Sequence, residues 1–321
     1  MTSTHLLDLS PAPCHTNSMK NTHLQHPEDS ILTGDLTALD WLLAEGDLSV
    51  KIDGAPAIVW GTNPATGNFF VGTKSVFNKV KIKINETHDD IDRNHSGVVA
   101  NILHHCFDCL PSFDGIVQGD FIGFGGDDTF CPNTITYIFD EVIEQNIIIA
   151  PHTLYATDGE LKDAYTINDM VDMEIFDDTE TCKFVQPSAW QVDEDFDEVV
   201  AFAKQMSMMC EFMDDKQSQQ IQQQLNSVIR AGLVIDDLTL DALAFANDID
   251  VNVLRLWSLV KSIKDDMLFL MRNNGPKAYI GRQQCGGEGY VKINEFGMFK
   301  YVNREQFSHA NFNNGKFACA S

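Results

Sequence analysis

The sequence has no apolar run close to the roughly 20 residues that a membrane-spanning helix needs. Residues 1–22 are polar and lack the basic-then-apolar pattern of a secretory signal, so we expect a flexible tail there. The eight cysteines follow no framework spacing, which favours reduced thiols in a cytoplasmic protein. No internal repeat is present. These absences indicate a globular, non-membrane protein, and 321 residues allow one large domain or two smaller ones.

Positive charge is scarce, with 22 Lys and Arg against 47 Asp and Glu and a formal net charge of −25. A negative protein slows the approach of a polyanion, which argues against ordinary nucleic-acid binding but does not forbid a local basic surface. The densest basic stretch holds Lys74, Lys79, Lys81 and Lys83. Apolar residues alternate with the last three lysines, which predicts a strand whose exposed face is either simply solvated or turned toward phosphates.

A second paired cluster that would complete a zinc site is also missing. The run from His104 to Cys109 holds two histidines and two cysteines, but no further pair supplies a closed set of four ligands. Apolar residues recur through the same run at helical spacing: Val98, Val99, Ile102, Leu103, Cys106 and Leu110. We therefore interpret Cys106 as a small core residue of a helix.

The remaining patterns divide the chain into a strand-rich part and a helical part. They predict helices over 27–45 and 98–110, and strands over 48–84, 115–122, 134–139 and 146–154. Three amphipathic stripes follow between 193 and 274. The predicted fold is α+β, with a core of antiparallel sheets and flanking helices formed by residues 23–190 and 276–321. Residues 191–275 are then a helical insertion that buries its own stripes.

The tetrapeptide from Lys51 to Gly54 (KIDG) is the most informative feature that is present. Apolar β-forming residues flank its Asp-Gly pair, so it reads as a strand, a turn and a second strand, with one lysine beside the turn. Gly54 would let the backbone approach a ligand or adopt a positive φ, and Asp53 would fix the turn. Alone the tetrapeptide is a weak signal, and a plain hairpin is the alternative interpretation.

Four further motifs follow in order: Val117-Gln118-Gly119-Asp120-Phe121-Ile122, Thr136-Tyr137-Ile138-Phe139-Asp140, Glu288-Gly289-Tyr290-Val291-Lys292 and Phe299-Lys300-Tyr301-Val302. With KIDG, this set resembles the motifs of the covalent nucleotidyltransferases, namely ATP-dependent DNA ligases, RNA ligases and mRNA capping enzymes. The resemblance runs from about residue 48 to 302, with a long interruption. The phrases at residues 23–29 and 72–79 resemble an uncharacterised family of large tailed bacteriophages, which implies a viral source and the host cytoplasm.

The resemblance implies a role for each motif. Lys51 would attack the α-phosphate of ATP or GTP, with Lys300 as the neighbouring cation and Lys292 as the second candidate for that role. Glu288 and Asp120 would help to hold Mg²⁺ or Mn²⁺, because hard cations prefer oxygen ligands. Asp53, Gly54 and Lys74 would contribute to nucleotide binding. Both Lys300 and Lys292 have the alternative of being ordinary surface lysines.

Two of these assignments keep alternatives. Asp158-Gly159-Glu160-Leu161 matches the wording of the family's acidic motif better than the motif around Asp120, but order and the preceding apolar run favour Asp120. The resemblance implies that Asp120 would bind the metal or the ribose. In the aromatic motif, Tyr137 and Phe139 share one face of a strand, so either ring could stack on the base. We favour Tyr137, since Phe139 suits plain core packing.

The sequence after Val302 is too short for the oligonucleotide-binding barrel that accompanies the catalytic core of DNA ligases and capping enzymes. An RNA-ligase-like arrangement is therefore the closer match. It implies an enzyme that forms a lysyl-AMP intermediate at Lys51 and passes AMP to a 5′-phosphate of RNA or DNA in strand joining. The alternatives are nucleotide transfer to a protein or small molecule, and a non-catalytic nucleotide-binding phage protein. The sequence leaves the oligomeric state open.

Overall fold

The computed structural model describes residues 24–167 and 176–307. The helices are α1 (Pro27–Ile31), α2 (Thr37–Leu43), α3 (His88–Asn94), α4 (Gly97–Cys109), α5 (Asp197–Ser207), α6 (Asp215–Arg230), α7 (Asp237–Asn247) and α8 (Val251–Leu270), with single 3₁₀ turns η1 (Lys74–Phe77) and η2 (Leu161–Asp163). Within the described ranges, no helix combines the length and the apolarity that crossing a membrane requires.

Short strands build most of the remainder. They are β1 (Asp47–Lys51), β2 (Ala57–Thr62), β3 (Phe69–Gly72), β4 (Ile116–Phe124), β5 (Thr129–Phe130), β6 (Thr136–Ile138), β7 (Ile147–Ala156), β8 (Tyr165–Thr166), β9 (Cys182–Phe184), β10 (Ala189–Gln191), β11 (Met271–Asn273), β12 (Lys277–Ile280), β13 (Gln283–Cys285), β14 (Gly289–Asn294) and β15 (Gly297–Tyr301). The pairings are antiparallel except for β7 with β9. The predicted α+β class is confirmed.

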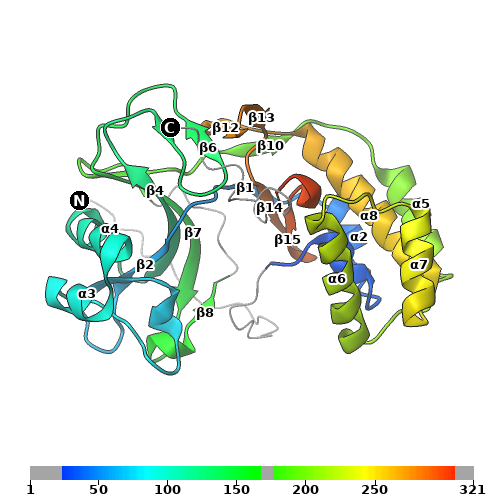
Figure 1. Cartoon of the computed structure of the whole chain (residues 1–321), viewed down its shortest axis with the longest axis horizontal. Coiled ribbons are helices and arrows are strands. Elements are labelled where there is room, and N and C mark those ends of the chain that lie inside the picture. The colour runs from blue at the N-terminus through cyan, green and yellow to red at the C-terminus, as the bar shows by residue number, and fades with distance from the viewer. Residues whose placement is uncertain (1–23, 168–175, 308–321) are drawn as a thin grey trace, which may run out of the picture.

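The largest sheet has the strand order β3-β2-β4-β7-β8, with β9 paired to β7. Alternate residues of its strands face α4, where Trp60, Val117 and Phe121 pack with Leu103 and Cys106 of the helix. Gln118 and Asp120 belong to the opposite set of β4 and therefore project from the other face. In Figure 1 this sheet and helices α3 and α4 lie at the left.

A three-stranded sheet, β1-β14-β15, lies between the large sheet and the helices at the right of Figure 1. One of its faces is apolar, and Tyr290, Phe299 and Tyr301 pack there against Trp41 of α2 and Met267 of α8. Because side chains alternate along a strand, Ser49, Lys51, Val291 and Lys300 lie on the other face. This sheet thus presents a polar face away from the helices.

Helices α5–α8 form at the predicted place, and three of them begin at an aspartate N-cap. Asp214, Asp236 and Asp250 each accept a hydrogen bond from a backbone N–H of the first turn. Part of the negative charge therefore lies where helix dipoles favour it. The expectation that this segment buries its own stripes holds for much of α6–α8, whose apolar residues pack on one another, but not for α5 and the rest of α8. Apolar residues of α5 and α8 share one cluster with α1, α2, β14 and β15, and Leu32 joins a second cluster with α6–α8.

Buried charges join the helical segment to the same elements. Lys264 of α8 is fully buried and its Nζ lies 2.8 Å from Glu28 Oε1 in α1. Arg304 contacts Glu28 and Asp29 at 3.2 and 2.8 Å and also Asn226 of α6. The Trp257 indole donates to Asp29. The division into a core of 23–190 and 276–321 with an insertion at 191–275 remains a prediction, but the segment shares a buried cluster and buried ion pairs with α1, α2, β14 and β15 or the residues next to them.

Three local predictions need correction. The single helix over 27–45 is two helices, since Gly34 with a φ of +83° follows α1. The basic stretch is not a strand: apart from one bridge between Val71 and Asn85, residues 78–85 pair with no strand in the described chain. The prediction of reduced thiols is wrong for Cys131, which is disulfide-bonded. It holds for the five described cysteines that are free: Cys106, Cys109, Cys182, Cys210 and Cys285.

Candidate active site

Lys51 is the last residue of β1 and sits opposite Gly289 in the β1–β14 pairing. Glu288 directly precedes β14, so this register brings the Lys51 side chain next to it. Lys51 Nζ lies 2.5 Å from Glu288 Oε2. The two side chains are 32% and 16% exposed, so the pair is sheltered but reachable from solvent. The hairpin alternative is excluded, because β1 and β2 belong to different sheets.

Lys300 projects from the same sheet face as Lys51, two strands away in β15. Burial lowers the pKa of the Lys300 ammonium, and the charge of Lys51 lowers it further. Its backbone N–H donates to the carbonyl of Gln25. No hydrogen bond or ion pair of its ammonium is found among the residues that the structure describes. Lys300 therefore offers a desolvated positive charge beside the Lys51–Glu288 pair.

Lys292 does not belong to this site, which corrects the prediction that it could assist Lys51. Its side chain leaves the opposite face of β14, donates to the carbonyl of Leu42 at 3.2 Å and lies over the Trp41 ring. Burial lowers its pKa to about 8. The physical reason is the β alternation: Tyr290 and Lys292 face the helices together. Lys292 is a structural residue of the sheet–helix interface.

Asp53 and Gly54 connect the small sheet to the large one. The Asp53 backbone N–H donates to the Tyr137 hydroxyl at 2.8 Å, and Asn133 Nδ2 donates to Asp53 Oδ2 at 2.8 Å. The Gly54 N–H points to Asp120 Oδ2 at 3.4 Å. A Cβ on Gly54 would lie 2.6 Å from the carbonyl oxygen of Phe121. Gly54 is thus required by close packing on β4, and a positive φ plays no part.

Three carboxylates converge near Lys51. Burial raises the pKa of Asp53 to about 6, and the negative charges of Glu288 and Asp120 add to this, whereas Lys51 and Asn133 oppose it. Within the described residues, no group of three or more His, Cys, Asp or Glu is already arranged as a metal cage. The donor set still fits a hard cation such as Mg²⁺, which uses one or two carboxylates and takes its other ligands from water and phosphates.

The burial of Asp53, together with the nearby carboxylates, raises its pKa and predicts a gain in stability for Asp53→Asn. A carboxyl group whose pKa rises on folding binds its proton more tightly in the folded state, so stability falls as pH rises from about 4 to about 6. Asp53→Asn should raise the free energy of unfolding by about 1–3 kcal/mol at pH 8, after allowance for partial exposure, and by nothing at pH 4.

Urea unfolding of both proteins at the two pH values measures this difference. The exposed Asp158→Asn variant is the control and should match the parent protein at both pH values. A difference at Asp53 that does not depend on pH would contradict the raised pKa of this carboxyl group.

The aromatic motif is placed in the interior. Tyr137 is 1% exposed and packs with Ile52, Ile122 and Phe130. The prediction that Tyr137 stacks on a base is therefore wrong for the molecule as described, since its ring has no free face. Phe139 is only partly buried and meets Phe130 edge to face at 5.7 Å between ring centroids. Phe139 is the more accessible of the two.

Neither Lys74 nor Glu160 makes a hydrogen bond or ion pair to Lys51, Glu288, Asp53 or Asp120 in the described part of the chain. Lys74 begins η1, two residues beyond β3, and is exposed. Because Gly72 pairs with Val59, the chain leaves β3 at the same end of the strands as Ala57 and Asp120. Glu160 lies in an exposed turn and pairs with Lys162. The structure therefore brings Asp120, and not Glu160, to Gly54.

His152 also lies at this site, although no sequence motif pointed to it. A register shift between Gln118 and Gly119 leaves His152 as an extra residue of β7, and its Nε2 lies 3.6 Å from Asp120 Oδ1 and 3.2 Å from Gln118 Nε2. Tyr155 donates to Gln118 Oε1 at 2.9 Å, so Gln118 is held in place beside the imidazole. Gln118 stands in the acidic motif and could have been identified from it. A β-bulge leaves no comparable sequence signal.

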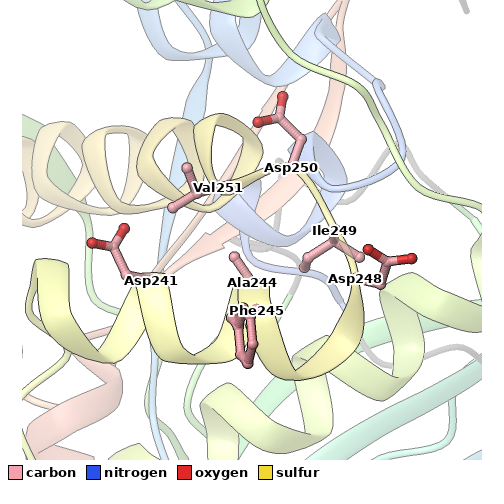
Figure 2. Close-up of a pocket in the computed structure, with 7 residues that line it drawn as sticks. All are labelled: Asp241, Ala244, Phe245, Asp248, Ile249, Asp250 and Val251. Atoms are coloured by element: carbon pink, nitrogen blue, oxygen red, sulfur yellow. The ribbon is translucent and has the colours of Figure 1, made fainter.

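A pocket of about 480 Å³ lies elsewhere, where α7 turns into α8. Figure 2 shows Asp241, Asp248 and Asp250 around Phe245. Asp241 pairs with Arg255, and Asp250 caps α8 and accepts from the Glu211 N–H. These contacts give Asp241 and Asp250 structural roles.

A family model described as a family of unknown function (DUF6267) matches residues 21–243 and 236–316. The matched ranges include the helical segment and all the residues around Lys51. No curated protein and no solved structure matches the chain. Since the matches extend over most of the sequence, the chain belongs to the DUF6267 family.

Proposed function

We propose that this protein is a covalent nucleotidyltransferase with a core like that of the RNA and DNA ligases, and that Lys51 is its nucleophile. The observation that carries the proposal is the pairing of Lys51 Nζ with Glu288 Oε2 at 2.5 Å, beside Lys300 on the same sheet face. These residues are 237 and 249 positions from Lys51 in sequence, yet they converge as the motif order implies.

The reaction requires Lys51 to lose a proton before it attacks, because an ammonium has no lone pair. Glu288 is in hydrogen-bond reach of that proton. The Nζ–P bond to the α-phosphorus then forms while the α–β bridging P–O bond breaks, and pyrophosphate leaves with the electron pair. Lys300 would stabilise negative charge that develops on the α-phosphate, since its desolvation strengthens the interaction.

A bound Mg²⁺ or Mn²⁺ would neutralise the phosphates of the nucleotide. Asp120, Asp53 and Glu288 are the residues that would hold it, directly or through water. ATP is the proposed nucleotide, with GTP as the alternative. Phe139 is the ring that we now propose for contact with the base, because Tyr137 is buried.

The proposed acceptor is a 5′-phosphate of RNA or DNA. This choice is favoured by the exposed lysines in the segment from Lys74 to Lys83, which could bind phosphates. Many lysines elsewhere are neutralised in ion pairs, for example Lys183 with Asp178 and Lys204 with Asp40. Lys74, Lys79 and Lys81 are exposed and have no ion pair within the described chain, and Val80 beside them is 77% exposed. The loop therefore keeps a local positive charge on a protein of net charge −25.

Charge reversal of this loop should weaken nucleic-acid binding. For Lys79→Glu with Lys81→Glu, we expect weaker binding of a 5′-phosphorylated RNA oligonucleotide and a shallower salt dependence, with the slope falling by about one unit for each phosphate that the protein no longer neutralises. Fluorescence anisotropy at several salt concentrations measures both. The pair Lys204→Glu and Lys216→Glu on the helical segment changes the net charge equally and should leave binding unchanged. If the parent protein binds no RNA or DNA at low salt, the acceptor is a protein or a small molecule.

The proposal itself is tested by intact mass spectrometry after incubation with ATP and Mg²⁺. The protein should gain the mass of one AMP, and acid but not alkali should remove it, as expected for a phosphoramidate. Noncovalent ATP binding without a mass gain would favour the alternative of a non-catalytic nucleotide-binding protein. If the protein neither binds nor gains mass with ATP or with GTP, both the proposed enzyme and the non-catalytic alternative are contradicted.

A further inference from the structure

Two histidines far from Lys51 face each other between α3 and α4. His88 is the first residue of α3 and His104 lies in the middle of α4, and their Nδ1 atoms are 2.7 Å apart. The ring centroids are 5.0 Å apart and the rings are inclined by only 21°. The centroid distance exceeds the nitrogen distance by about one ring diameter. The two Nδ1 atoms therefore point at each other along the ring planes, and the rings are not stacked face to face.

Each ring is fixed from its outer side by a carboxylate. His88 Nε2 lies 3.0 Å from Asp108 Oδ1, and His104 Nε2 lies 3.0 Å from Asp92 Oδ1. An ionised carboxylate only accepts hydrogen bonds, so both Nε2 atoms carry the proton. In the neutral imidazole the lone pair is then on Nδ1. Two lone pairs that face each other at this distance repel unless a cation lies between them.

We infer that His88 and His104 bind a late first-row divalent metal ion, Cu²⁺, Zn²⁺ or Ni²⁺, through their Nδ1 atoms. Imidazole suits these ions and not Mg²⁺. Because the two Nδ1 atoms point at each other, the ion would lie between them on a near-straight line, and two bonds of about 2.0–2.1 Å then place the nitrogens about 4 Å apart. The rings, now 2.7 Å apart at these atoms, must therefore separate by about 1.4 Å to admit the ion. Waters complete the coordination, in keeping with the absence of any cage of three protein ligands in the described chain.

The surroundings match what a metal-binding histidine needs. A carboxylate that accepts from the far ring nitrogen fixes the tautomer and makes the ligand more basic, and here both rings have one. His88 is 46% and His104 28% exposed, so water and metal ions can reach the gap. The Phe107 ring, with its centroid 5.0 Å from that of His88, forms an apolar wall on one side.

This site differs from the zinc cluster that the sequence around His104 suggests. Cys106 is fully buried in the core, and burial raises the pKa of its thiol well above the usual value. A thiol must lose its proton to bind a metal, so Cys106 is excluded as a ligand. The second ligand comes instead from His88, which lies 16 positions earlier in the sequence. Metal binding there would cross-link α3 to α4 without involving Lys51.

The test is calorimetric titration of the metal-free full-length protein with Cu²⁺ and with Zn²⁺. We expect the parent protein to bind one equivalent more of each ion than His88→Asn and His104→Asn bind. For Cu²⁺, the electron paramagnetic resonance spectrum should lose its two-nitrogen pattern in either variant. His105→Asn removes the neighbouring histidine, whose Nδ1 faces the Asn101 carbonyl, and should change nothing.

Variants of the carboxylates give a second readout. Asp92→Asn and Asp108→Asn, both at exposed positions, should weaken metal binding by about 10- to 100-fold while the fold is kept. They also keep the test decisive if a histidine variant does not fold. The inference is overturned if the parent protein binds the same number of equivalents as His88→Asn, or if neither ion binds, since a shared proton alone would then join the two rings.

Discussion

Lys51→Arg should abolish covalent nucleotide attachment while leaving ATP and Mg²⁺ binding within a few-fold of the parent value. Arginine keeps the positive charge, so it can still pair with Glu288, but its guanidinium stays protonated and cannot attack phosphorus. Lys300→Ala should instead slow attachment by about 10²–10³-fold, because it removes charge stabilisation and keeps the nucleophile. Intact mass spectrometry over time measures both effects.

Lys292→Met is the matched control for these variants. Lys292 lies in the same small sheet, but its side chain faces Trp41 and the helices. The variant should therefore label at close to the parent rate. Labelling of Lys51→Arg at the parent rate would place the nucleophile elsewhere, and a loss of labelling in Lys292→Met without unfolding would contradict the assignment of the two sheet faces.

Lys264→Met should lower the free energy of unfolding by about 3–5 kcal/mol, the usual effect of removing one partner from a buried ion pair. Lys264 and Glu28 are both fully buried, and the substitution leaves the Glu28 carboxylate with Arg304 as its remaining close cation. The positive charge of Lys264 helps to hold the pKa of Glu28 below its usual value in spite of burial. Urea unfolding followed by circular dichroism gives the change.

Two further variants identify the cause of that change. Glu28→Gln combined with Lys264→Met removes both charges and should recover most of the lost stability. Lys162→Met breaks an exposed pair with Glu160 and should change stability by less than about 1 kcal/mol. An equal loss in the single and the double variant would show that the packing of Lys264, and not its charge, is what matters.

The strands and their faces could largely be predicted from alternation. In Phe299-Lys300-Tyr301 the aromatic residues face the helices and the lysine faces away, as the pattern indicates. The same rule would put Glu288 on one face with Tyr290 and Lys292, yet Glu288 reaches Lys51. Gly287 and Gly289 have φ values of +86° and +138°, which interrupt the regular pleat. A Cβ on Gly289 would lie 2.1 Å from the Tyr301 carbonyl oxygen.

What the sequence could not predict depends on contacts between distant segments. Lysines 79, 81 and 83 alternate with apolar residues as in a strand, but a strand needs a neighbouring edge to pair with, and the described chain offers only the bridge between Val71 and Asn85. An amphipathic stripe likewise predicts a helix but not the surface that covers it, so the packing of α5 and α8 against α2 and the small sheet could not be predicted. His88 and His104 meet only because α3 packs on α4.

The most direct test of the proposed function is to locate the nucleotide on the chain. The protein is incubated with ATP and Mg²⁺, digested at neutral or alkaline pH to preserve a phosphoramidate, and sequenced by tandem mass spectrometry. The account predicts AMP on Lys51 and on no other residue. AMP on a different residue, or no AMP on any peptide of a folded protein that binds ATP, would contradict it.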